Sequence, residues 1–119
     1  MPIEKNSNLY NKIGYSLNGL CSAFFSERAI RNEFISLIFM TLLSLIYNRD
    51  ILKSLCVMLL CTIPLMIELI NTSAEIIIDL MLGSVYREEI RVAKDMLSCA
   101  VFFSLCISYG MSLLVIFYF

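Results

Sequence analysis

Histidine is absent from the chain, and charged residues make up only 16% of its 119 positions. Without histidine, Ser-His-Asp and Cys-His nucleophilic sites cannot form. The cysteines show no Cys-x-x-Cys spacing, so the usual zinc-binding sets are excluded as well. We interpret the cysteines as small apolar helix residues: Cys21, Cys56, Cys61, Cys99 and Cys106. Any proton transfer must therefore use carboxylates, lysine, tyrosine or water.

A basic surface and a phosphate-binding glycine loop are also missing. The formal net charge is -1 at pH 7 and no DNA- or RNA-binding motif is present, which argues against a nucleic-acid partner. No Gly-x-x-x-x-Gly-Lys-Ser/Thr loop occurs, since the glycines stand at Gly14, Gly19, Gly83 and Gly110. A kinase built on this chain must hold its nucleotide without a Walker loop.

Hydrophobic residues are in excess: they form 60% of the chain, and the mean hydropathy is +0.84. This composition predicts an all-α membrane protein. Leu9, Ile13, Leu17, Leu20 and Phe24 recur at helical spacing, which indicates an amphipathic helix over residues 9–26. In so hydrophobic a chain we expect an N-terminal surface helix in the membrane interface, with a core-facing helix as the alternative. Apolar runs predict three transmembrane helices, over residues 29–48, 54–82 and 96–119, within a single domain spanning residues 1–119.

Two local features mark the second and third predicted spans. Pro64 lies inside the second span, where proline is expected to bend a helix. In the third span, small residues repeat every four positions, at Ala100, Ser104, Ser108 and Ser112. Such a stripe of small residues lets membrane helices approach closely.

Three spans place the two termini on opposite sides of the membrane, and the basic residues indicate which side is which. One side carries Arg49 and Lys53, whereas the other carries Lys5, Lys12, Arg28, Arg31, Arg87, Arg91 and Lys94. The positive-inside rule then predicts a cytoplasmic N-terminus in a multi-pass protein.

Acidic residues gather in the second half of the second span. At about 100° per residue, Glu68, Asn71, Glu75 and Asp79 share an arc of only about 80° on a helix. An ionisable side chain within a membrane helix is costly unless it is paired or solvated. This acidic stripe is therefore the candidate functional site.

The residues alone leave three interpretations of the stripe open. The carboxylates bind ions or carry protons, as in a small non-enzymatic carrier subunit. Alternatively, they hold a metal and act as a base beside a nucleotide. In the third interpretation they only pair with Arg28 or Arg31 of a neighbouring helix.

One segment resembles a known family. Glu-Leu-Ile-Asn-Thr-Ser-Ala-Glu at residues 68–75, then Asp79 and Ala-Lys-Asp-Met at residues 93–96, is similar to the signature of the prokaryotic diacylglycerol kinases. The upstream pieces agree in order and spacing: Gly14-Tyr15-Ser16, Gly19-Leu20, Glu27 and Arg31-Asn32-Glu33. The likeness covers nearly the whole chain.

The resemblance implies an ATP-dependent lipid kinase of the bacterial inner membrane. It implies a homotrimer with active sites between subunits at the cytoplasmic interface, and Mg²⁺ as cofactor. By position, Glu68 is the expected general base on the lipid hydroxyl, while Glu27 and Glu75 are expected to hold Mg²⁺ and the nucleotide. The remaining expected contacts are those of Tyr15, Tyr86, Lys94 and Asp95 with the nucleotide, and of Asn71 and Ser98, together with Glu68, with the lipid.

The acceptor lipid is the finest expectation from the resemblance. The Gly-Tyr-Ser and Ala-Lys-Asp-Met-x-Ser segments resemble the diacylglycerol branch, whereas Ile-Asn-Thr and Ile-Asp-Leu resemble the undecaprenol kinase branch. We expect phosphorylation of the primary hydroxyl of diacylglycerol to give phosphatidic acid, with undecaprenol as the alternative acceptor. The chain departs from the family pattern at Asn8, Asn18 and Arg87, which affects the outer nucleotide contacts.

Overall fold

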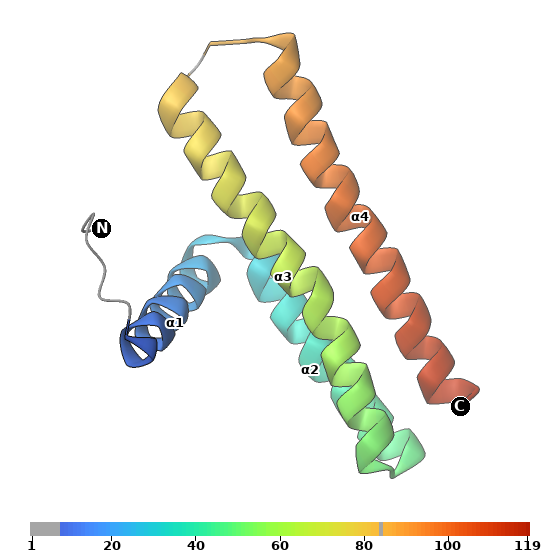
Figure 1. The fold of residues 1–119 in the computed structure, drawn as a ribbon. Helices are drawn as coiled ribbons and strands as arrows, with labels where there is room; N and C mark the ends of the chain where they lie inside the picture. Colours follow the sequence, from blue (N-terminus) through green and yellow to red (C-terminus); the bar gives the residue numbers. More distant parts are fainter. Residues whose placement is uncertain (1–7, 84) are drawn as a thin grey trace.

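The computed structural model describes residues 8–83 and 85–119, and Lys5 of the orientation argument lies outside them. The described residues form four α-helices and no strand: α1 (Leu9–Ser26), α2 (Arg28–Asn48), α3 (Ile51–Leu82) and α4 (Glu88–Phe117). The last three are long and apolar enough to cross a membrane and run up and down beside one another (Figure 1). The prediction of an all-α membrane protein with three spanning helices and an N-terminal helix is confirmed.

Helix α1 leads away from the three long helices (Figure 1). The Asn8 side chain caps it by accepting a hydrogen bond from the backbone N–H of Tyr10 at 2.9 Å. None of its residues is buried, and its apolar stripe remains exposed at Leu9, Ile13 and Leu17. A helix with an exposed apolar stripe suits the membrane interface better than water.

The helix boundaries differ from the sequence expectations at two starts. Helix α3 begins at Ile51 rather than residue 54, because the Asp50 side chain caps it by accepting from the Leu52 N–H at 2.9 Å. Helix α4 begins at Glu88 rather than residue 96, because the charged segment before the apolar run is helical too. Arg91 pairs there with Glu88 one turn before it and with Asp95 one turn after it.

The central helix is α3, which packs along both α2 and α4, whereas α2 and α4 have few contacts with each other. At 1.5 Å per residue, the 32 residues of α3 extend about 48 Å, against about 32 Å for the 21 residues of α2. The end of α3 and the start of α4 therefore project beyond the start of α2 (Figure 1). The acidic stripe begins at Glu68, which is buried, and continues into the projecting part of α3.

The apolar core lies in the other half of the bundle, where Met40 of α2, Val57 and Cys61 of α3 and Ile116 of α4 are buried together. Helix α3 continues through Pro64, which is itself buried. Proline has no N–H, so the carbonyl of Leu60 loses its intrahelical donor. The hydroxyl of Ser108 on α4 donates to that carbonyl instead. A residue of the small-residue stripe thus supplies the hydrogen-bond donor that Pro64 lacks.

Candidate active site

Two carboxylates are buried where α2 meets α3. Glu68 of α3 is 8% exposed and Glu33 of α2 is 7% exposed, and their charges interact. The Asn71 side-chain amide donates to Glu68 Oε1 at 3.4 Å. Among the described residues, Glu33 Oε2 and Asn71 Oδ1 are buried without a hydrogen-bond partner. Acceptors left unpaired in this way are complementary to a donor such as a hydroxyl group.

From the sequence, Glu33 stands out only as part of Arg31-Asn32-Glu33 and has no expected role. The signal that places it was present, since Ile30, Glu33, Leu37 and Met40 repeat at helical spacing and share one face of α2. Ile30 and Met40 are buried on that face, so a carboxylate among them must also point inward. An acid on the apolar face of a helix indicates a buried carboxylate more strongly than an acid near a helix end does.

The outer half of the acidic stripe faces α4. Glu75 is half-buried and Asp79 is exposed. Lys94 of α4 donates from Nζ to Asp79 Oδ1 at 2.7 Å, and its charge is also attracted to Glu75. Asp79, to which the sequence assigned no task, therefore ties the projecting end of α3 to α4 and positions the expected nucleotide residue Lys94.

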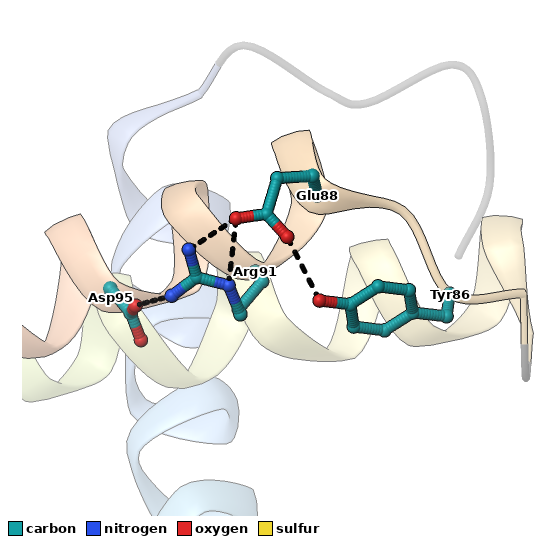
Figure 2. A network of polar contacts seen from close by, with 4 residues as sticks. All are labelled: Tyr86, Glu88, Arg91 and Asp95. Atoms are coloured by element: carbon teal, nitrogen blue, oxygen red, sulfur yellow. Dashed lines mark hydrogen bonds and ion pairs between the residues drawn. The ribbon is translucent and has the colours of Figure 1, made fainter.

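A second polar network surrounds Arg91 at the start of α4 (Figure 2). The Tyr86 hydroxyl donates to Glu88 Oε2 at 2.9 Å, and Arg91 Nη1 donates to Asp95 Oδ2 at 2.7 Å. Arg91 also donates to Glu88 Oε1 from Nε, at 3.2 Å, and from Nη2. Two expected nucleotide residues, Tyr86 and Asp95, are thus joined through two residues that the sequence analysis did not assign.

A cavity of about 290 Å³ lies between the end of α3 and the start of α4. Its wall includes Asp79, Tyr86, Arg91 and Lys94. A second hollow, of about 420 Å³, lies between α1 and α3, with Ser26 and Ile76 in its wall. Neither of the expected metal ligands, Glu27 and Glu75, lines this hollow.

Other expected site residues are not gathered with these. Tyr15 lies on α1 in the wall of a separate hollow, and Ser98 is exposed on α4. Figure 1 shows α1 well apart from the start of α4, which carries Lys94 and Asp95. One copy of the chain therefore does not bring all the expected nucleotide residues to one place.

The carboxylates expected to hold Mg²⁺ are those of Glu27 and Glu75. Within residues 8–83 and 85–119, no group of three or more histidine, cysteine, aspartate or glutamate side chains could hold a metal ion. Mg²⁺ is commonly held by one or two carboxylates, with substrate phosphates and waters completing its shell. Glu27 and Glu75 fit that limited role and do not form a protein-only metal site.

Pairing of the stripe with Arg28 or Arg31 is not seen in the described part of the chain. Arg31 donates from Nη1 to the backbone carbonyls of Phe24 and Phe25, at 3.0 and 3.1 Å, where it closes the end of α1. The ion pairs of the described residues join Arg87 to Glu89, Arg91 to Glu88 and Asp95, and Lys94 to Asp79. None of these ion pairs includes Glu68.

Known proteins resemble this chain over most of its length. The family model described as prokaryotic diacylglycerol kinase matches residues 14–116. The chain belongs to this family. The match to the prokaryotic diacylglycerol kinase model runs from the first half of α1 to the end of α4 and includes every expected site residue. The resemblance stated from the motifs is confirmed.

Individual relatives are similar over most of the chain. A diacylglycerol kinase of Haemophilus influenzae is 31% identical over 101 residues, which cover 85% of both chains. One from Helicobacter pylori strain 26695 is 33% identical over 92 residues, covering 77% of this chain and 71% of the relative. One from Synechocystis is 30% identical over 106 residues, covering 84% of this chain and 60% of the relative.

Proposed function

We propose that the protein is an ATP-dependent diacylglycerol kinase that transfers the γ-phosphate of ATP to the primary hydroxyl of the lipid and releases phosphatidic acid. The observation that carries this proposal is the buried Glu68 carboxylate, hydrogen-bonded to Asn71 beside unpaired acceptors. The site stands at the base of a projecting helix pair whose outer end bears Lys94 and Arg91. A lipid hydroxyl from the bilayer and a nucleotide from the aqueous side can meet there.

Glu68 acts as the general base. It accepts the proton of the lipid hydroxyl as the hydroxyl oxygen forms its bond to the γ-phosphorus and the bond to the ADP oxygen breaks. Phosphoryl transfer depends mainly on positioning and on charge stabilisation. Asn71 supports this by orienting the Glu68 carboxylate, and the buried acceptors of Glu33 and Asn71 attract the hydroxyl donor. Ser98 contacts the lipid further along α4.

The nucleotide end of the site is built from carboxylates and cations together. Glu27 and Glu75 would hold Mg²⁺, which would offset the charge of the phosphate oxygens when bound. Lys94, already attracted to Glu75, lies next to that position and supplies a further positive charge to the phosphates. Tyr15, Tyr86 and Asp95 complete the nucleotide contacts.

The functional unit is a homotrimer in the bacterial inner membrane, with the N-terminus and the projecting helix ends in the cytoplasm. The separation of α1 from the start of α4 within one chain supports a site that is shared between subunits (Figure 1). The excess of basic residues on the α1 side and in Arg87–Lys94 supports the orientation. Cross-linking of the purified protein, analysed by its subunit ladder, tests the trimer.

A labelled-phosphate assay tests the function. Purified protein in neutral detergent micelles receives γ-labelled ATP and Mg²⁺ with diacylglycerol, with undecaprenol, or with no added lipid. We expect label in phosphatidic acid and little in undecaprenyl phosphate. Preferential labelling of undecaprenol would replace the proposed acceptor. Ion flux into vesicles with no labelled lipid would overturn the kinase proposal in favour of a carrier.

The Glu68→Gln variant tests the base. It keeps the side-chain volume and the contact with Asn71 but cannot accept the proton, so we expect turnover to fall at least about a hundredfold. The matched control is Glu89→Gln, because Glu89 is exposed and, among residues 8–83 and 85–119, forms an ion pair only with Arg87, at 3.9 Å. Near-normal turnover of Glu68→Gln, with unchanged helical content, would exclude Glu68 as the base.

A further inference from the structure

Arg91 occupies the centre of the network in Figure 2. Three of its guanidinium nitrogens donate to carboxylates of its own helix, two of them to Glu88 and one to Asp95. Glu88 in turn accepts from the Tyr86 hydroxyl at 2.9 Å. One guanidinium therefore sets the positions of Tyr86 and Asp95, which are nine residues apart and are both expected to contact the nucleotide.

The network also has an electrostatic consequence. Glu88 and Asp95 place two carboxylates against Arg91. The proposed occupant of the cavity that Arg91 lines, ATP, is a polyanion. Arg91 lies between these carboxylates and also lines the cavity. Its positive charge reduces the repulsion that an approaching phosphate chain meets from both of them.

The geometry of the side chain matters as well as its charge. A planar guanidinium donates along several fixed directions at once, whereas a lysine ammonium is a point charge on a flexible stem. The two bonds to Glu88 and the bond to Asp95 use these directions. Lysine at this position retains the charge but cannot hold both carboxylates in the same arrangement.

From these contacts we infer that Arg91 is a positioning residue of the nucleotide site, which orients Tyr86 and Asp95 and compensates the charge of Glu88 and Asp95. This inference rests on the proposed function, because it takes ATP as the occupant of the cavity. Arg91 acts through its neighbours and does not itself touch the transferred phosphate. Its effect is on nucleotide affinity and not on the chemical step.

The test compares Arg91→Gln and Arg91→Lys with the wild type. We expect Arg91→Gln to raise the KM for ATP about five- to tenfold, because two exposed carboxylates are left uncompensated near a polyanion. The kcat and the KM for the lipid stay within about twofold, because Glu68 and the lipid contacts lie elsewhere. Arg91→Lys gives an intermediate KM for ATP, since it restores the charge without the geometry.

The control for the loss of one positive charge is Arg49→Gln. Arg49 is exposed in the turn between α2 and α3, at the opposite end of the bundle. The kinetic constants of Arg49→Gln are therefore expected to match those of the wild type. Raising the salt concentration narrows the difference between Arg91→Gln and wild type, because exposed charges are screened. Equal KM values for ATP in wild type and Arg91→Gln would overturn the inference.

A direct binding measurement separates this inference from the proposed function. Binding of a fluorescent, non-hydrolysable ATP analogue is followed by polarisation in wild type, Arg91→Gln and Arg49→Gln. Weaker binding of the analogue only in Arg91→Gln supports the inference, even if lipid phosphorylation is absent. Absence of lipid phosphorylation would overturn the proposed activity alone. Equal binding in all three proteins overturns the inference and leaves the kinase proposal standing.

Discussion

Replacing Ser108 with alanine tests how the chain accommodates Pro64 in the middle of a membrane helix. Pro64 cannot donate to the carbonyl of Leu60, and the hydroxyl of Ser108 on α4 donates to it instead. Ser108 is only 1% exposed, so water does not replace the lost donor readily. Ser108→Ala therefore leaves a buried backbone acceptor without a partner.

The size of the effect follows from these contacts. A buried acceptor that loses its donor costs about 1–3 kcal/mol, while polar contacts between membrane helices average about 0.6 kcal/mol and reach about 1.7. Pro64 has no N–H, so no donor within α3 replaces Ser108 at the Leu60 carbonyl. We therefore expect Ser108→Ala to lower the free energy of unfolding by about 1–2 kcal/mol. This changes the ratio of folded to unfolded protein by a factor of about 5–30.

Unfolding is measured in mixed micelles by adding SDS and following the circular dichroism of the helices. In a Pro64→Ala background the residue 64 amide donates to Leu60 again, so Ser108→Ala should then cost less than about 0.5 kcal/mol. The control is Ser104→Ala, because Ser104 donates only within α4, to the Val101 carbonyl at 2.7 Å. An equal cost of Ser108→Ala with Pro64 and with Ala at position 64 would refute the reasoning.

Two further predictions concern the acidic site. Glu75→Gln removes one of two carboxylates proposed for Mg²⁺, so the metal concentration for half-maximal lipid phosphorylation should rise about tenfold, which corresponds to about 1.4 kcal/mol; an unchanged titration curve, with Glu89→Gln as control, would contradict metal ligation. Glu33→Gln replaces a buried carboxylate beside Glu68 with an amide that can donate a hydrogen bond, so it should raise the free energy of unfolding by about 1–2 kcal/mol in the same SDS titration. A lower free energy of unfolding in Glu33→Gln would show that repulsion between the Glu33 and Glu68 carboxylates does not destabilise the protein.

The sequence by itself determined the helices and one side of the site. Apolar runs require internally hydrogen-bonded helices in a bilayer, and helical spacing places Glu68, Asn71, Glu75 and Asp79 on one stripe. Both are local properties of the chain, so no knowledge of the neighbouring helices was needed. The start of α4 was misjudged by eight residues, because pairs between charged residues one turn apart extended the helix through a segment that hydropathy reads as its end.

The partners across helices were decided only by the tertiary structure. The spacing of acids on α3 does not reveal that Glu33 of α2 lies beside Glu68, nor that Lys94 reaches Asp79. Likewise, Pro64 signals an unpaired carbonyl, but not that Ser108 supplies the donor. These contacts depend on how each helix is rotated and shifted against its neighbour, which side-chain packing over the whole interface sets. Periodicity records which residues share a face, and packing decides what that face meets.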